Sequence, residues 1–191
     1  MGHEATSDAP TVVSMTNHAY WNLGGPGAAT VADHVVTVDA DRWVPVDAAA
    51  LPLDGPLPVD ATPFDLRGGA PCGDLFALAH PATAPAPAGI DHCLLVAGTG
   101  LRRHARLDHP ASGRAVEVWS DQPGVQVYAG GHLPDRPAAH GWRLRPHAGW
   151  CLEPGLPPDA PNRPWAPPSI LRPGERYRHR CRIVLERGAG D

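Results

Sequence analysis

The chain of 191 residues contains no lysine, and all sixteen of its basic residues are arginine. Charged residues make up only 19% of the sequence, and the formal net charge is -4. This balance argues against the strongly basic surface that binds polyanions, so we expect no nucleic-acid partner. No apolar run approaches the ~20 residues that a membrane-spanning helix needs, so we expect no membrane partner either.

Cysteine is scarce as well, and metal-binding motifs are missing. The four cysteines form no CxxC pair, and an even number alone is weak evidence for disulfides in a chain of this length. We favour buried free thiols in a reducing compartment. Because the first residues show neither the basic nor the apolar segment of a signal peptide, we expect the cytoplasm. The eleven histidines show no HExxH or similar spacing, so we expect no metal site.

Helical periodicity is nearly absent, whereas short β-branched runs recur between clusters of Gly, Pro and Asp. A polar turn at residues 108–114 between two such runs predicts a hairpin. We find no internal repeat and no boundary, so we expect one domain over residues 1–191. The class is all-β, a sandwich of antiparallel sheets. The strands are expected at residues 11–16, 34–38, 42–46, 90–96, 101–107, 115–120, 125–128, 150–152 and 177–186.

Residues 48–89 carry little periodic signal and much proline. We expect a long connection over the surface, with one short extended piece at residues 62–66 and near low complexity at residues 82–89. A loop of this length inside a compact domain is more often functional than filler.

Glu153 is the first candidate for chemistry. It follows the apolar run Trp150-Cys151-Leu152 and precedes Pro154. Proline cannot donate a hydrogen bond to a sheet ladder, so we expect the strand to end here, with the carboxylate facing a cleft. The alternative is an ordinary solvated acid at a strand end.

Three further polar residues follow or begin predicted strands, or alternate with apolar ones. His18 precedes the aromatic pair Tyr20-Trp21 and is suited to proton transfer near neutral pH, or is a structural histidine. Asp91 begins a strand and either enters a cleft or caps a turn. Gln126 faces away from two valines, where it either binds a polyol ligand or lies exposed on an outer strand face.

The order of these segments resembles the aldose 1-epimerase (galactose mutarotase) family over nearly the whole chain. The matching stretches are residues 16–23, 62–67, 89–92, 112–114, 123–128, 151–153, 158–162 and 171–175.

The resemblance implies an antiparallel β-sandwich and a sugar isomerase that uses no metal, nucleotide or redox cofactor. It implies that His18 is the general acid and Glu153 the general base, while Asp91 and Gln126 hold sugar hydroxyls or support the catalytic pair. The substrate would be an aldose such as glucose or galactose, whose α and β anomers interconvert by ring opening and closure. We expect the four side chains to converge on one concave face.

The sequence departs from the family in two respects. Pro154-Gly155 stand where the family usually has a small polar residue and Gln. The chain also resembles only the C-terminal portion of the family, without an N-terminal half that supplies an arginine and a second histidine. We therefore expect a partner, either that half or a second copy. The alternative functions are an inactive remnant, a carbohydrate-binding module, or an epimerase of phosphorylated sugars.

Overall fold

Two six-stranded antiparallel sheets form the protein, in a computed structural model that describes residues 1–25, 27–47, 49–78 and 89–187. The first sheet has the order β1 (Gly2–Ala5), β16 (Tyr177–Glu186), β10 (Arg114–Ser120), β9 (Arg102–His109), β4 (Val35–Val38) and β7 (Ala70–Pro71). The second has the order β3 (Tyr20–Trp21), β14 (Trp150–Gly155), β11 (Gly124–Tyr128), β8 (Asp91–Leu95), β5 (Arg42–Trp43) and β6 (Leu57–Pro58).

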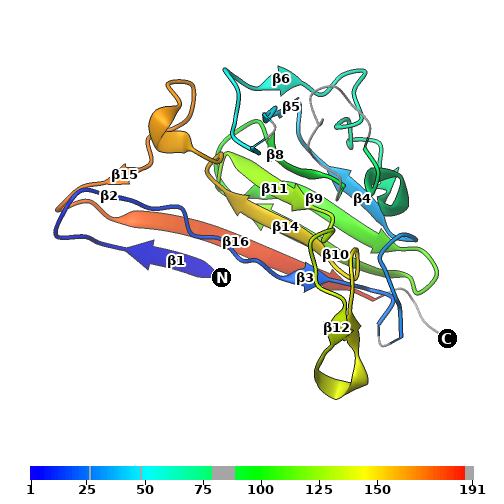
Figure 1. Cartoon of the computed structure of the whole chain (residues 1–191). Helices are drawn as coiled ribbons and strands as arrows, with labels where there is room; N and C mark the ends of the chain where they lie inside the picture. Colours follow the sequence, from blue (N-terminus) through cyan, green and yellow to red (C-terminus); the bar gives the residue numbers. More distant parts are fainter. Residues whose placement is uncertain (26, 48, 79–88, 188–191) are drawn as a thin grey trace.

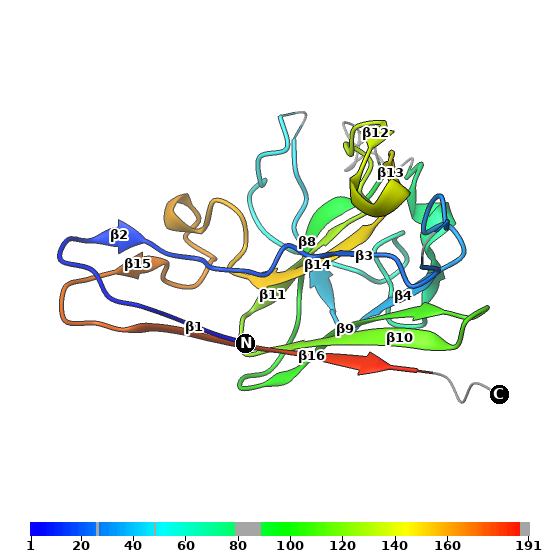
Figure 2. The same ribbon diagram turned by 90° about the horizontal axis from the view of Figure 1, so that it is seen from below.

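The two sheets lie in separate layers, as Figures 1 and 2 show, and the core lies between them. Fully buried side chains come from both layers, among them Leu107 and Val116 from the first and Leu94 and Trp150 from the second. Burial of each such side chain stabilises the fold by roughly 1.5–3 kcal/mol. The all-β sandwich that the sequence predicts is confirmed.

Smaller elements surround these sheets. The pair β2 (Thr11–Val12) and β15 (Ile170–Leu171) extends beyond one end of the sheets in Figure 2. A second pair joins β12 (Arg136–Pro137) and β13 (Arg143–Leu144). The 3-10 turns are η1 (Cys72–Leu75), η3 (Ala139–Gly141) and η4 (Ala160–Asn162). In the described part of the chain, no helix is long and apolar enough to cross a membrane.

Strand β16 and the hairpin of β9 and β10 agree with the sequence pattern. β16 covers the predicted residues 177–186, and β9 pairs with β10 across a turn between His109 and Arg114. Alternation buries His179 and Cys181, but Leu185 at the far end is 68% exposed. The alternation of buried and exposed residues is therefore clear in the middle of β16 and is lost at its far end.

The connection of residues 48–89 is not the surface loop that the sequence predicts. Phe64, Leu66 and Leu75 are buried in the core, and the Phe64 ring stacks on Trp43 at 3.8 Å between centroids. The expected extended piece at residues 62–66 is a turn, because the Thr62 hydroxyl donates to the Val59 carbonyl and accepts from the Phe64 amide. Residues 79–88, and with them nearly all of the low-complexity stretch, lie outside the described residues.

Among the predicted strands, those at residues 11–16 and 42–46 are shortened most, and that at residues 150–152 is extended most. Strands β2 and β5 contain two residues each. Strand β14 passes Pro154 and ends at Gly155. The Leu156 amide, two residues beyond Pro154, donates to Ser14 Oγ. The Pro154 nitrogen therefore faces the same edge of β14 as the Leu156 amide. Along this edge, β3 pairs only with Trp150 and Cys151. A proline fits within a strand at a position where no neighbouring strand needs a hydrogen bond from its nitrogen.

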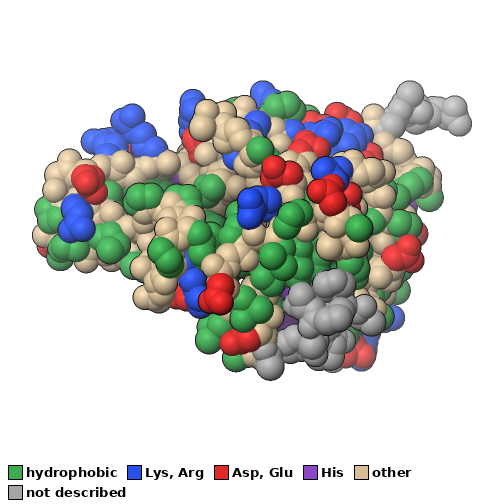
Figure 3. Space-filling model, turned by 90° about the horizontal axis from the view of Figure 1, so that it is seen from above, with side chains coloured by type: hydrophobic (Ala, Val, Ile, Leu, Met, Phe, Trp, Pro, Cys, Tyr) green, Lys and Arg blue, Asp and Glu red, His purple; other side chains and the backbone are tan. Residues whose placement is uncertain are grey.

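The first sheet carries mixed charges on its outer surface. Arg103 contacts Asp39 and Glu117, and Arg106 contacts Asp108 and Glu117. Arginine and acidic side chains also lie next to one another on the face seen in Figure 3. Exposed pairs of this kind each contribute roughly 0–1 kcal/mol.

We predict that acid destabilises the fold through buried neutral histidines. Burial lowers the pKa of His92 to about 4, although Asp91 nearby opposes this effect. The unfolded chain, with a His pKa near 6.5, binds the proton more tightly, so stability is full above about pH 6.5 and falls by up to about 3 kcal/mol as the pH drops to about 4. Replacing His92→Leu should flatten this part of a plot of unfolding free energy against pH.

The exposed His140 serves as the control, since it lies outside the core. Its positive φ of 58° favours His140→Asn as the substitution. An equal flattening by His140→Asn, or none by His92→Leu, would contradict the assignment to His92.

Candidate functional site

One face of the second sheet collects polar side chains from three paired strands. Gln126 of β11 lies opposite Glu153 of β14, and Tyr128 of β11 lies opposite both Cys151 of β14 and Asp91 of β8. Residues directly opposite in antiparallel strands point to the same face. These five side chains therefore share the face of the sheet that points away from the core.

Alternation along β14 and β11 creates this separation. Trp150 and Leu152 enter the core, and so do Val125 and Val127. Cys151 and Gln126 between them, and Glu153 after Leu152, must point to the opposite face because side chains alternate along a strand. The same short sequence thus stabilises the sandwich on one side and presents a carboxylate on the other.

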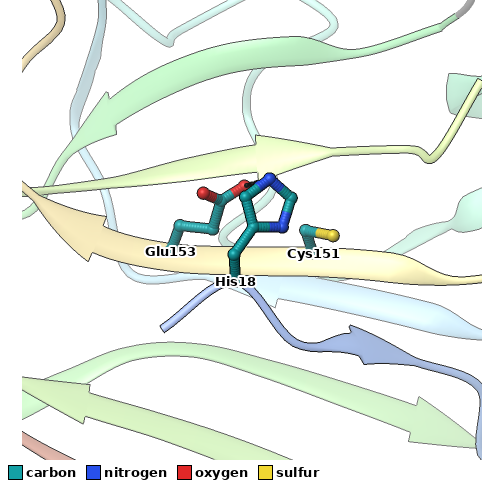
Figure 4. A group of neighbouring side chains, drawn as sticks. All are labelled: His18, Cys151 and Glu153. Carbon is teal, nitrogen blue, oxygen red and sulfur yellow. Dashed lines mark ion pairs between the residues drawn. The ribbon is translucent and has the colours of Figure 1, made fainter. Parts of the chain in front are cut away.

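His18 reaches this face from the segment before β3. Its Nε2 lies 3.5 Å from Glu153 Oε1, and its ring stacks on Tyr20 at 5.1 Å between centroids. In Figure 4 the His18 ring lies over the side chains of Glu153 and Cys151, which both project from β14. The imidazole is 51% exposed and the carboxylate 11% exposed. A solvent-accessible histidine therefore faces a largely buried carboxylate.

Burial raises the pKa of Glu153, an effect that His18 opposes and the Asp91 charge reinforces. A carboxylate with a raised pKa accepts a proton more readily at neutral pH than an exposed one, provided that it is ionised. This environment suits a general base.

Asp91 and Gln126 form a pair beside Glu153. The Gln126 amide donates to Asp91 Oδ1 at 2.7 Å, while Asp91 is exposed and Gln126 is half-buried. This hydrogen bond uses the amide nitrogen of Gln126, so the amide oxygen of Gln126 can still accept a hydrogen bond. The second carboxylate oxygen of Asp91 can accept one as well. The sequence left open whether Gln126 binds a polyol ligand or lies exposed on an outer strand face. In the structure its side chain is not fully exposed.

Hydrogen bonds hold both ends of the segment that carries His18. Before it, the Met15 carbonyl accepts from His179 Nδ1 at 2.9 Å, and the Met15 amide donates to the Tyr177 hydroxyl at 3.2 Å. After β3, the Leu23 amide donates to the fully buried His34 Nε2 at 2.8 Å. This segment is thereby fastened to the first sheet by β16 and to the second sheet by β3.

The Asp33 carboxylate completes the second anchor. Its oxygens bind His34 Nδ1 at 2.9 Å and His109 Nε2 at 3.1 Å, and His109 Nδ1 binds Ser112 Oγ at 2.7 Å. Although Asp33, His34 and His109 are close enough to hold an ion, all four ring nitrogens have hydrogen-bond partners. We interpret this group as a structural network.

Three residues of the site escaped the sequence analysis as participants. The sequence pattern does not single out Tyr128, indicates only a buried thiol at Cys151, and marks Tyr20 only as part of the aromatic pair after His18. Burial raises the pKa of Tyr20 to about 12, so its hydroxyl stays protonated beside Cys151. The spacing of two residues from Cys151 to Glu153 and from Gln126 to Tyr128 could have indicated that each pair shares a face.

The structure thus brings together all four residues selected from the sequence. His18 and Glu153 face each other, and Asp91 and Gln126 lie beside them on the same face. Chemically, the arrangement offers a proton donor and acceptor pair, together with an amide and a second carboxylate that can bind hydroxyl groups.

Comparison with known proteins identifies relatives over more than nine-tenths of the chain. The family model for aldose 1-epimerase matches residues 1–184. A galactose mutarotase from Homo sapiens is 39% identical over 181 residues, which is 94% of this chain and 51% of the relative. An aldose 1-epimerase from Escherichia coli (strain K12) is 35% identical over 182 residues, which is 92% of this chain and 51% of the relative.

Solved structures agree. An aldose epimerase homologue from C. elegans superimposes with a TM-score of 0.81 at 26% identity, covering 98% of this chain and 55% of that one. A galactose 1-epimerase from Lactobacillus acidophilus gives a TM-score of 0.80 at 26% identity, covering 98% and 52%. The chain spans about half the length of the curated relatives that it matches. With a family model matched over residues 1–184 and a shared fold, the chain belongs to the aldose 1-epimerase family.

Proposed function

We propose that the chain interconverts the α and β anomers of an aldose, a hexose such as glucose or galactose, as an isomerase. The observation that carries the proposal is the 3.5 Å approach of His18 Nε2 to the largely buried Glu153 carboxylate. The names of its relatives, galactose mutarotase and aldose 1-epimerase, support an aldose as the substrate, and the choice of glucose or galactose is the finer part of the proposal.

In the proposed reaction, Glu153 accepts the proton of the anomeric hydroxyl and His18 protonates the ring oxygen. The bond between C1 and the ring oxygen breaks, which leaves an aldehyde at C1 and a hydroxyl at C5. Rotation about the C1–C2 bond then presents the other face of the aldehyde, and reversal of both proton transfers closes the ring. The two groups exchange roles on closure, so no net proton is gained or lost.

The sugar would enter between the acid and the base. His18 is 51% exposed and can move, whereas Glu153 is fixed on β14. Asp91 and Gln126 would bind hydroxyl groups of the ring and hold C1 within hydrogen-bond reach of Glu153, about 2.6–3.2 Å. Tyr20, which stacks on His18, would contact an apolar face of the ring.

A carbohydrate-binding module or inactive remnant is the second candidate. The departure at Pro154-Gly155 favours it, because the residue after Glu153 has no N–H and cannot donate a bond that would orient the carboxylate. Acceleration of anomer interconversion separates the two candidates, since a binding module binds sugar without it. For the epimerase of phosphorylated sugars, we assign no basic phosphate site.

Three further proposals accompany this function. One domain over residues 1–191 is supported by a core that both sheets share. A cytoplasmic location is supported by four buried cysteines that are all free. A partner, either an N-terminal half or a second copy, is supported by exposed apolar side chains such as Val12 and Ile170, which pair across β2 and β15.

We predict that, once the proposed N-terminal half is supplied, Glu153→Gln lowers the rate of anomer interconversion by roughly 10²–10⁴-fold, because the amide keeps the shape but cannot take the anomeric proton. His18→Asn should have an effect of similar size. Polarimetry on freshly dissolved α-D-glucose and α-D-galactose, corrected for the spontaneous rate, measures this, and sugar binding should persist in Glu153→Gln. We expect the chain alone to be weakly active.

Glu4→Gln is the matched control. Glu4 is exposed and pairs with Arg176 on the first sheet, so its loss should leave the rate unchanged. Sugar binding without any acceleration would favour the binding module, and full activity in Glu153→Gln would refute the assignment of the base.

We predict that Gln126→Glu moves the acid limb of the pH–rate profile to higher pH. The new carboxylate would lie opposite Glu153 and within hydrogen-bond distance of Asp91. Like charges raise the pKa of a carboxyl group, so Glu153 would be ionised only at higher pH. The uncharged variant Gln126→Met should weaken sugar binding without moving the acid limb of the pH–rate profile. If Gln126→Glu also left the acid limb in place, the assignment of Glu153 as the base would be contradicted.

We predict that the chain associates with a second copy at micromolar concentrations. The exposed side chains of Val12 and Ile170 form one apolar contact area, and β6 and β1 leave strand edges unpaired. Sedimentation velocity over a range of concentrations should show a dimer that the double variant Val12→Glu, Ile170→Arg weakens. A compact monomer that melts cooperatively at every concentration would exclude this partner.

A further inference from the structure

The acid and base of the proposed reaction lie beside a third donor that this reaction does not use. One ligand atom each from His18, Cys151 and Glu153 lie within 4.8 Å of one another. Cys151 and Glu153 stand two residues apart on β14, and the His18 ring covers both from the segment before β3 (Figure 4). Imidazole nitrogen, thiolate sulfur and carboxylate oxygen are the three donor types of protein zinc sites.

The spacing of these donors is close to that of a metal site. Zinc binds sulfur at about 2.3 Å and nitrogen or oxygen at about 2.0–2.2 Å, which places tetrahedral ligands roughly 3.5 Å apart. His18 Nε2 and Glu153 Oε1 already have this separation, 3.5 Å. The imidazole is half exposed and can close the remaining gap to the sulfur, whereas Cys151 and Glu153 are held by β14.

Three protein ligands leave one position of the tetrahedron for water. The combination of a soft sulfur with nitrogen and oxygen favours zinc over magnesium, which prefers oxygen alone. The cluster of Asp33, His34 and His109 does not compete for the ion, because all four of its ring nitrogens are engaged in hydrogen bonds.

We propose that His18, Cys151 and Glu153 form an inhibitory site for Zn²⁺. The ion would occupy the proton donor and the proton acceptor together, so sugar could not react while it is bound. The inhibition rests on the proposed epimerase function, whereas binding of the ion does not. No catalytic role belongs to the metal.

Binding exchanges one proton for the ion. Zn²⁺ joins neutral His18, the Glu153 carboxylate and the Cys151 thiol, and the thiol proton leaves to solvent. Affinity therefore increases with pH, by about tenfold per unit where only this proton is released.

The first test is a titration of the full chain, without a histidine tag, with Co²⁺ and Zn²⁺. Co²⁺ bound to a thiolate gives a sulfur-to-metal charge-transfer band in the near ultraviolet, and Zn²⁺ should remove it by displacement. Calorimetry at two pH values should show one ion per chain, release of a proton and tighter binding at the higher pH. Mg²⁺ should not bind.

The matched variants are Cys151→Ser and Cys93→Ser. Both thiols are buried and free on strands of the second sheet that flank β11, but only Cys151 belongs to the cluster. Cys151→Ser should abolish the charge-transfer band and weaken Zn²⁺ binding on the order of 100-fold or more. Loss of a residue that only hydrogen-bonds to a metal ligand already lowers affinity by about 10–100-fold, and loss of the ligand itself should cost at least as much. Cys93→Ser should retain both.

Inhibition is measured by polarimetry with and without Zn²⁺, followed by a chelator. Reversible inhibition of the wild type and loss of zinc sensitivity in Cys151→Ser would support the site. Unchanged zinc affinity in Cys151→Ser, or no thiolate band in the wild type, would overturn it. If Cys151→Ser does not fold, ¹¹³Cd NMR of the wild type decides, because its chemical shift reports whether sulfur binds the ion. Zinc binding without measurable epimerase activity, even when the proposed N-terminal half is supplied, would instead contradict the proposed function.

Discussion

The antiparallel register between β14, β11 and β8 is the constraint on which the site depends. It places Glu153 opposite Gln126, and Tyr128 opposite both Cys151 and Asp91. The same register sends Trp150, Leu152 and Val127 into the core. A slip of one residue would turn the tryptophan outward and bury the carboxylate, so the hydrophobic effect enforces the geometry of the polar face.

His18 adds to this rigid face a group with greater freedom. Its segment is fastened before it by His179 and after it by the buried His34, while the imidazole itself is half exposed. Buried histidines thus serve as anchors, and an exposed one is available for proton transfer. Burial lowers the pKa of His34 and of His179, because it disfavours the charged form of an imidazole.

Partial burial of Glu153 has two consequences. It raises the pKa of the carboxyl, which suits proton transfer, and it brings the carboxylate beside the buried sulfur of Cys151. A site that concentrates a proton acceptor, an imidazole and a thiol also has the donors for a soft cation. Reactivity toward sugars and sensitivity to metal would then arise from the same spacing along one strand.

The sequence by itself determined the all-β class, strand β16, the hairpin of β9 and β10, and, through resemblance, the choice of His18, Asp91, Gln126 and Glu153. These features depend on the alternation of apolar and polar residues, on turn residues and on short motifs, all of which can be recognised from residues close together in the sequence. The tertiary structure decided that β14 continues past Pro154, because only the limited pairing of β3 shows which side of the strand lacks a ladder. It also decided that residues near Phe64 turn into the core and that Cys151 joins His18. The contacts of β14 with β3 and of Cys151 with His18 join segments more than a hundred residues apart. No local pattern records which distant segment will cover a given face.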